Sequence, residues 1–382
     1  GYKPMRHEGK ITGLAAHGRY DHVAEQFEKM FGFENGEFRY YLAEEQYQHA
    51  YPHRTNYDKF RAALPKEFET FTPADVAAGV QVLTERVVAR YVDQYLQKSG
   101  PIDVVMAGGV FANVRVNQAV AELPNAQSVF IFPAMGDNGI PAGAALHTFY
   151  QSMGWPEIKT MPKLDDVYLG PSYTDAEIEA ELKKAGLQYT WHDHIAPVIA
   201  DLLNKSSVVA RFDGRMEYGP RALGNRTILY QSTDKSVNDW LNHKLHRTEF
   251  MPFAPVTLAE DMEENYHGIA KNDYPARFMT ITFNCSESMQ KGCPAVVHVD
   301  NTARPQLIDE KTNRVYYNIV KEYKKLTGLS SVINTSFNMH EEPIVCTPGD
   351  AIRAFTQGYL EYLAISNFLV PSPTPEKARS RE

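Results

Sequence analysis

The pattern of apolar and polar positions divides the chain into alternating helices and strands. The clearest helix is predicted over residues 74–98, where apolar residues recur at helical spacing. Thr72 can cap this helix, and Gly100 followed by Pro101 ends it. We expect its apolar stripe to lie in the core, and this stripe consists of Val76, Val80, Leu83, Val87, Tyr91 and Tyr95.

The following segments repeat a rhythm of strand, glycine turn and helix. Residues 102–106 and 128–132 are short apolar runs, each followed by a glycine-rich loop and then a helical pattern. Residues 278–283 alternate as a strand would, and residues 8–18 are punctuated by glycine like a loop that leads into a helix. This rhythm predicts an α/β fold with ligands at the carboxyl ends of the strands.

The periodicity is lost over residues 154–164, which contain two prolines. We therefore predict one domain over residues 1–158 and a second over residues 165–370. Residues 371–382 carry three prolines and scattered charges and are expected to be a disordered tail.

The densest cluster of cations lies directly after the predicted strand at residues 208–212. Arg215, Arg221 and Arg226 alternate with glycines and a proline between residues 214 and 226. An arginine side chain binds oxyanions in pairs of hydrogen bonds, and glycine lets the backbone come close to an anion. The segment is interpreted as an anion-binding loop, and the alternative is a surface turn with solvated charges.

The bulk composition narrows the class of protein. The 382 residues are 43% apolar and 23% charged, as in ordinary soluble proteins. No apolar run approaches the ~20 residues that span a bilayer, and three cysteines are too few for a disulfide framework, which predicts a cytoplasmic protein without a membrane partner. A net charge of −8 argues against a nucleic-acid partner and makes the arginine loop more indicative of a small anion.

Other local motifs are weak when taken alone. The glycine pair at residues 108–109 is a weak phosphate signal before a helix, and Asp137 lies in a common tight-turn sequence. The pairs His192/His194 and His243/His246 have no third ligand nearby, so no metal is assigned to them.

Taken together and in order, six segments resemble the O-carbamoyltransferases of nodulation-factor, cephamycin and aminoglycoside antibiotic biosynthesis. The resemblance extends from about residue 8 to residue 363, and the six segments are residues 108–113, 136–139, 214–229, 247–255, 298–306 and 334–355. It implies the C-terminal part of an actin-like, sugar-kinase-type ATPase (ASKHA) domain, followed by a YrdC-like α/β twisted-sheet domain.

The resemblance also implies the reaction. The second domain would convert carbamoyl phosphate and ATP, with Mg²⁺, to carbamoyl adenylate. The first would transfer the carbamoyl group to a hydroxyl of a small metabolite, and relatives suggest a homodimer. The alternatives are a tRNA-modifying threonylcarbamoyl transferase-like enzyme and a non-catalytic nucleotide-binding module.

Site residues follow from the matching motifs. The activation pocket is expected to contain Arg215, Arg221, Lys244, Arg247, Arg304, Asn334 and Ser336. Nucleotide or phosphate contacts are expected from Gly108, Gly109, Val110, Asn113, Gly136, Arg226 and Thr302. Asp137 matches a ligand of iron(II) or another divalent metal.

The sequence departs from the family pattern in two places. The paired metal-ligand histidines and the first phosphate-binding hairpin lie upstream of a motif like residues 8–18, and neither occurs in this sequence. We therefore expect an N-terminal segment of the first domain to be missing, which puts metal binding at Asp137 in doubt. Met251 stands where many relatives carry arginine.

Overall fold

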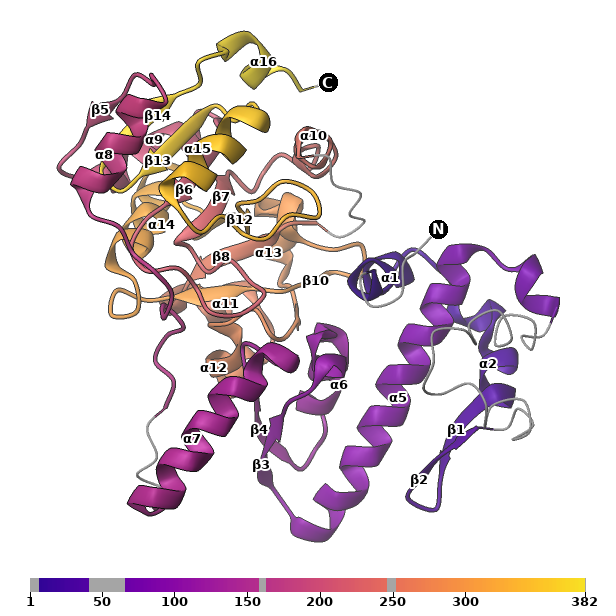
Figure 1. Cartoon of the computed structure of the whole chain (residues 1–382). Helices are drawn as coiled ribbons and strands as arrows, with labels where there is room; N and C mark the ends of the chain where they lie inside the picture. Colours follow the sequence, from indigo (N-terminus) through magenta and orange to yellow (C-terminus); the bar gives the residue numbers. More distant parts are fainter. Residues whose placement is uncertain (1–6, 41–65, 158–162, 246–251, 382) are drawn as a thin grey trace. The chain divides into compact units, whose positions relative to one another are not determined.

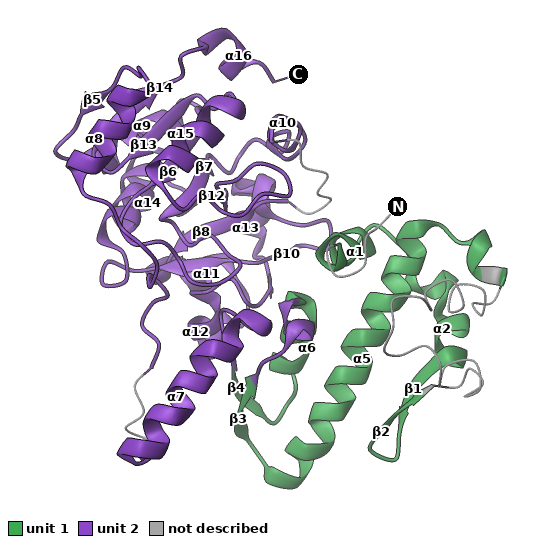
Figure 2. Ribbon diagram, viewed as in Figure 1, with its two compact units in different colours: residues 1–105, 113–129 green, residues 106–112, 130–382 purple. Residues whose placement is uncertain are grey.

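The computed structural model describes residues 7–40, 66–157, 163–245 and 252–381, which form two compact units (Figures 1 and 2). Unit 1 comprises Gly1–Val105 and Asn113–Val129, and unit 2 comprises Met106–Ala112 and Phe130–Glu382. This division by compactness differs from the domains expected at residues 1–158 and 165–370, which stay a prediction. None of the described helices is long and apolar enough to cross a bilayer.

Unit 1 is organised around the long helix α5 (Pro73–Ser99), as predicted. Its N-cap is Thr72, whose hydroxyl accepts the Asp75 N–H at 3.1 Å. Three shorter helices pack against it: α1 (Glu8–Ala15), α2 (Ala24–Met30) and α6 (Val114–Ala121). Strands β1 (Phe31–Glu34) and β2 (Glu37–Tyr40) form a hairpin, and β3 (Ile102–Met106) pairs with β4 (Ala126–Ile131).

The buried face of α5 differs from the prediction. Tyr95 and Val80 of the expected core stripe are 52% and 43% exposed. Three of the six buried positions are instead small, namely Ala77, Ala78 and Gly79, and the others are Gln81, Leu96 and the capping-region Asp75. The reason is close packing at Gly79, where an added Cβ would lie 2.3 Å from the Phe27 ring. The prediction assumed that the large apolar side chains of the helix would be buried, but the helix packs against its neighbours through small residues. The loop expected at residues 8–18 is also wrong over residues 8–15, which form α1.

Unit 2 contains an eight-stranded mixed sheet, and the predicted α/β class is confirmed. The strand order is β11-β8-β12-β7-β6-β13-β14-β5. Pairs β11–β8 and β13–β6 are parallel, and the remaining neighbours are antiparallel. The bounds are β5 (Thr190–Trp191), β6 (Val209–Phe212), β7 (Arg226–Tyr230), β8 (Ala254–Leu258), β11 (Gln306–Ile308), β12 (Ser331–Ser336), β13 (Tyr362–Ile365) and β14 (Phe368–Pro371).

Helices cover this sheet and bury its apolar side chains. Helices α9 (Ile195–Asn204) and α14 (Arg314–Thr327) pack on each other and on the sheet, with Ile199, Ile319 and Val332 fully buried between them. Helix α15 (Pro348–Gln357) contacts β6, β13 and helix α8 (Asp175–Lys184) (Figure 1). Helix α10 (Val237–Lys244) follows β7.

Three further expectations are corrected in unit 2. The strand expected at residues 278–283 is reduced to β9 (Phe283–Asn284), because Met279 has a left-handed φ of 56° that breaks an extended run. The glycine-rich loop expected after residues 128–132 is short, since α7 (Ile140–Met153) already begins at Ile140. The expected disordered tail instead contains helix α16 (Pro375–Arg379).

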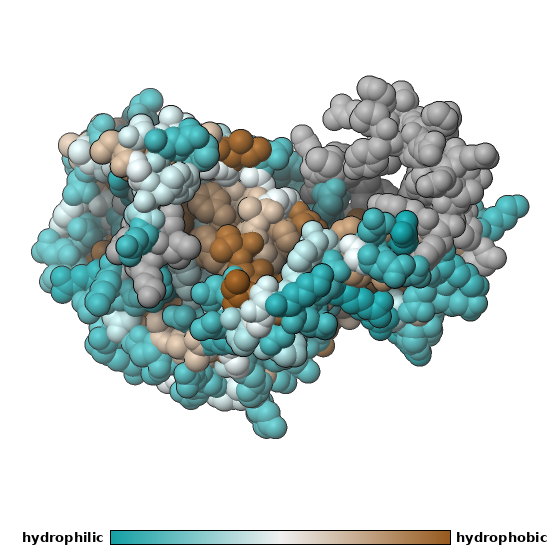
Figure 3. Space-filling view, turned by 90° about the horizontal axis from the view of Figure 1, so that it is seen from below, coloured by the Kyte–Doolittle hydropathy of each residue, from teal (hydrophilic) through white to brown (hydrophobic). Residues whose placement is uncertain are grey.

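Apolar side chains are also exposed on the surface, as the space-filling view shows for one face (Figure 3). Helix α7 buries no residue and carries several exposed apolar side chains. Ile140, Phe149 and Met153 are 66%, 54% and 71% exposed.

Candidate functional site

Five of the residues expected in the activation pocket lie at one edge of the large sheet, namely Arg215, Arg221, Arg304, Asn334 and Ser336. Strand β6 ends there and β7 begins, with Phe212 paired to Arg226. Strand β12 ends beside them, because Ser336 pairs with Thr227. The starts of β8 and β11 complete the edge through their register with β12 and with each other. Sequence segments more than 100 residues apart are thereby brought together.

Arg226 lies inside the arginine loop and is fully buried. Its guanidinium donates hydrogen bonds to the carbonyls of Asp213, Asn225, Pro171 and Gly214 at 2.8–3.3 Å. It also stacks over Phe212, with its Cζ atom 3.6 Å from the ring centroid. Burial lowers the pKa of Arg226 to about 10, and the nearby Glu217 carboxylate opposes this shift. In the structure Arg226 therefore holds the backbone of the loop in place. The sequence predicted that this side chain would contact the nucleotide or its phosphates.

Asn334 is likewise buried, and its side chain holds neighbouring parts of the site together. Its amide donates to the Ala222 carbonyl at 3.1 Å and to Oε1 of Gln306 at 2.7 Å. Its Oδ1 accepts a hydrogen bond from the Thr227 hydroxyl. In this arrangement Asn334 fixes the backbone next to Arg221, and it is 1% exposed.

The remaining loop and edge residues have surface that a ligand can reach. Arg215 is exposed and donates to the carbonyls of Leu169 and Gly170 at 2.9 and 3.2 Å. Arg221, Arg304 and Ser336 are half-buried. Arg247 lies outside the described residues, between α10 and β8.

Two other candidates are engaged in contacts within the protein. Lys244 donates to the carbonyls of Lys377, at 3.3 Å, and Ala378 in α16. Burial, followed by the charge of Arg381, lowers the pKa of Lys244 to about 8. Thr302 is buried, and its hydroxyl donates to Oδ1 of Asp300 at 2.6 Å.

The expected nucleotide loop contains an exposed glycine turn. Gly108 has a φ of 116°, which favours glycine, and its N–H donates to the Met135 carbonyl at 2.7 Å. Gly109 and Val110 are also exposed. Asn113 instead caps α6 by accepting the Val116 N–H at 3.3 Å, and it exchanges two hydrogen bonds with Gln81.

Asp137 is exposed at the start of a short turn, directly after the half-buried Gly136. Within the described ranges, no group of three or more His, Cys, Asp or Glu side chains is arranged to hold a metal ion. Metal binding at Asp137 stays a prediction.

The Asp137 turn touches the arginine loop within unit 2. The Tyr218 hydroxyl donates a hydrogen bond to the Asn138 carbonyl. At Gly219 an added Cβ would lie 3.3 Å from the Pro133 carbonyl oxygen. The two loops that the sequence assigned to separate domains thus lie against each other.

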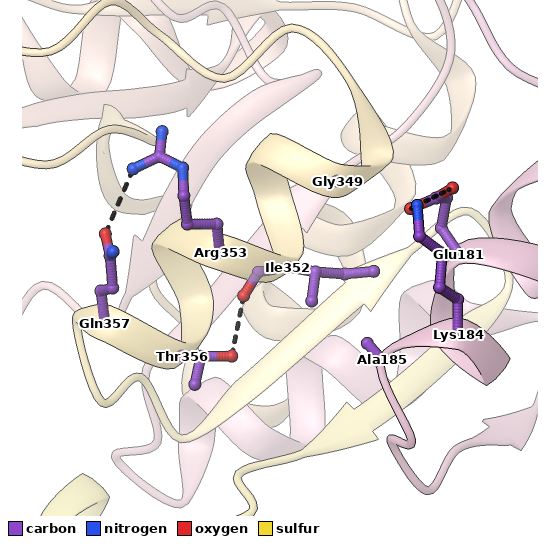
Figure 4. A pocket seen from close by; sticks show the side chains of 8 residues that line it. All are labelled: Glu181, Lys184, Ala185, Gly349, Ile352, Arg353, Thr356 and Gln357. Carbon is purple, nitrogen blue, oxygen red and sulfur yellow. Dashed lines mark hydrogen bonds and ion pairs between the residues drawn. The ribbon is translucent and has the colours of Figure 1, made fainter.

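A surface hollow of about 480 Å³ lies between α8 and α15 (Figure 4). Its cations are already paired: Lys184 contacts Glu181 at 3.1 Å, and Arg353 donates to Gln357 at 3.2 Å. None of the predicted site residues lines it. We do not regard this hollow as the functional site.

Sequence reasoning missed the residues that hold the arginine loop in shape. Glu217 is buried, and its Oε1 accepts the N–H groups of Leu223, Asn225 and Arg226. Arg211, also buried, donates to the Gly224 carbonyl and to Asp213. Glu217 is the one acidic residue between positions 214 and 226, and this was a signal that could have identified it as an internal partner.

Known proteins resemble this chain over nearly its whole length. The family "Carbamoyltransferase N-terminus" matches residues 1–146, and "Carbamoyltransferase C-terminus" matches residues 200–372. An uncharacterized protein of Methanocaldococcus jannaschii is 34% identical over 97% of this chain and 60% of that protein. Nodulation protein NolO of Bradyrhizobium diazoefficiens is 31% identical over 96% of this chain and 66% of its own length.

A solved structure of full-length HypF in the phosphate- and nucleotide-bound form overlaps with a TM-score of 0.31 at 15% identity. The overlap covers 48% of this chain and 22% of HypF. An overlap of this size does not establish a shared fold. The matches at both ends of the sequence and the nodulation relatives, by contrast, agree with the resemblance found from the motifs. The chain belongs to the carbamoyltransferase family.

Proposed function

We propose that the whole protein is an ATP-dependent O-carbamoyltransferase that acts on a hydroxyl of a small metabolite. The chain spans about 60% of the M. jannaschii relative's length. The proposal therefore concerns the whole protein, and this chain supplies the activation site and part of the transfer site. Use of ATP and carbamoyl phosphate, both cytoplasmic metabolites, agrees with the predicted location.

The observation that carries the proposal is the convergence of cationic and polar candidates at one sheet edge. Arg215 and Arg221 come from the arginine loop, Arg304 lies in the loop before β11, and Ser336 ends the neighbouring strand. Carbamoyl phosphate and ATP are both polyanions, so their reaction needs cations that offset the mutual repulsion. Preorganised arginines supply this stabilisation without moving a proton.

The proposed activation step consumes one water molecule. Carbamoyl phosphate, ATP and water give carbamoyl adenylate, inorganic phosphate and pyrophosphate. Water first cleaves carbamoyl phosphate to carbamate and inorganic phosphate, which breaks the bond between the carbamate oxygen and phosphorus. The carbamate oxygen then attacks the α-phosphorus of ATP, the bond from that phosphorus to the oxygen bridging to the β-phosphate breaks, and pyrophosphate leaves. In the second step the acceptor oxygen attacks the carbamoyl carbon, AMP leaves, and the acceptor hydroxyl loses its proton.

The loops at Gly108 and Asp137 are the candidates for the transfer step. The contact between Tyr218 and Asn138 supports a short distance between the sites of the two steps, since it joins the arginine loop to the Asp137 turn.

The test measures each product of activation. The whole protein is incubated with carbamoyl phosphate and ATP, and pyrophosphate and phosphate are quantified. We expect both products in equal amounts, and neither when carbamoyl phosphate is omitted. Mass spectrometry with a panel of sugar and polyketide alcohols then identifies the acceptor. Nucleotide binding without pyrophosphate release would instead favour a non-catalytic module.

A further inference from the structure

The turn at residues 222–226, directly after Arg221, is held by side chains from several elements. The Leu223 carbonyl accepts hydrogen bonds from Tyr168, at 2.8 Å, and from Gln306, at 2.7 Å. The Ala222 carbonyl accepts from Asn334, and the Gly224 carbonyl accepts from Arg211. Three consecutive backbone carbonyls of this turn, at residues 222–224, are therefore held by side-chain donors.

The N–H groups of the same turn converge on one carboxylate. Oε1 of Glu217 accepts from the N–H groups of Leu223 and Asn225 at 2.8 Å, and from that of Arg226 at 3.2 Å. Glu217 is 5% exposed, and within the described part of the chain its other oxygen, Oε2, is buried without a hydrogen-bond partner. This carboxylate thus binds the backbone of the turn through a single oxygen.

We propose that Glu217 is a positioning residue that sets the direction of Arg221 toward the anionic substrate, by gathering three backbone N–H groups around Oε1. This inference rests on the proposed function, because it assigns Arg221 to anion binding. Glu217 is itself a buried residue of the loop, and it acts through the backbone of residues 223–226.

Because only one of the two Glu217 oxygens accepts hydrogen bonds, two substitutions can separate the effect of the side chain's length from the effect of its charge. Glu217→Gln keeps an acceptor at the Oε1 position and places its amide where Oε2 has no partner. Glu217→Asp keeps the charge but withdraws the carboxylate by one methylene group, so it no longer reaches all three N–H groups. The buried Arg226 loses a compensating charge only in the glutamine variant, which should therefore unfold more readily while its folded form stays competent.

A matched control exists at the opposite end of strand β6. Glu361 is 9% exposed, and its Oε2 accepts the Val208 N–H at 2.6 Å, directly before β6 begins. Glu361→Gln and Glu361→Asp change a comparable buried carboxylate away from the arginine loop.

The experiment measures the dissociation constant of inorganic pyrophosphate by calorimetry, with urea unfolding of each variant of the whole protein. We expect Glu217→Asp to weaken binding about tenfold or more, Glu217→Gln to stay within about threefold, and both Glu361 variants to bind as the wild type does. Wild-type binding by Glu217→Asp, or weaker binding by Glu217→Gln than by Glu217→Asp, would overturn the inference. If the wild type binds pyrophosphate but shows no turnover with carbamoyl phosphate and ATP, the proposed function fails while the role of Glu217 stands.

Discussion

At the scale of single residues, the arginines of one loop divide into those that build it and those that a ligand can reach. Arg226 is enclosed by backbone carbonyls, whereas Arg215 is exposed. Sequence could show that three arginines are interleaved with turn residues. It could not show which ones point inward, because that depends on the strands β6 and β7 that flank the loop.

Replacing Arg226 should therefore affect folding first. We expect Arg226→Ala to lower the free energy of unfolding by about 3 kcal/mol or more, because it leaves the Glu217 carboxylate buried without its cation. Arg215→Ala removes an exposed side chain and should cost less than about 1 kcal/mol. Urea denaturation of both variants compares the two costs, and equal values would contradict the assignment of Arg226 as an internal group.

Lys244 should give the protein a measurable pH dependence. Burial and Arg381 lower its pKa in the folded protein from 10.5 to about 8, so the unfolded chain binds more protons between these values. The contribution of Lys244 to the free energy of unfolding should therefore rise from pH 8 to pH 10.5. The stability difference between wild type and Lys244→Met, followed by urea denaturation across this range, should increase with pH. A constant or decreasing difference would contradict the lowered pKa.

At the scale of elements, the arginine loop depends on Gly224, because the structure leaves no space for a side chain at this position. Gly224 has a φ of 117°, and an added Cβ would lie 2.3 Å from the Tyr316 ring. Gly224→Ala should lower the free energy of unfolding by about 3 kcal/mol or more, because backbone strain and overpacking add together.

Gly186 is the matched control for that substitution. It also has a positive φ, 67°, but nothing lies within 4 Å of the position that an added Cβ would take. Gly186→Ala should cost about 1–2 kcal/mol from backbone strain alone. Equal losses in the melting temperatures of the two variants would show that the Tyr316 contact contributes nothing.

The C-terminal helix α16 is the second element with a clear role. Arg381, just beyond it, lies over Trp240 at 4.0 Å and donates to the Ser206 carbonyl at 3.0 Å. Arg381→Ala should cost about 1–2 kcal/mol in unfolding free energy. Arg379→Ala, at an exposed position in the same helix, should stay within about 0.5 kcal/mol. A thermal melt distinguishes them, and an unaffected Arg381→Ala variant would show that the tail is not anchored.

The sequence predicted helices better than it predicted their buried faces or the tail. The bounds of α5 were predicted closely because its cap and its terminating glycine are local signals. The burial of its small residues depends on Phe27, which is distant in sequence. Prolines in the last residues suggested disorder, but the contact of Arg381 with Trp240 could not be read from local composition.

At the scale of the whole molecule, the fold brings residues from motif segments that are distant in sequence close to one another. Five strands place Arg221, Arg304 and Ser336 at one sheet edge, and the arginine loop reaches the Asp137 turn. The order of motifs along the chain predicted the family, which both family matches confirm. Neither residue spacing nor composition could predict that Asn334 and Arg226 serve the backbone of the site.

The central claim is that the sheet edge activates carbamoyl phosphate with ATP, and pyrophosphate release by the whole protein tests it most directly. We expect release that requires both substrates, and a loss of about 100-fold or more in Arg221→Ala, with unfolding free energy nearly unchanged. Arg379→Ala provides the matched surface control and should release pyrophosphate at the wild-type rate. Pyrophosphate release by Arg221→Ala at the wild-type rate, or none by the wild type, would contradict the claim.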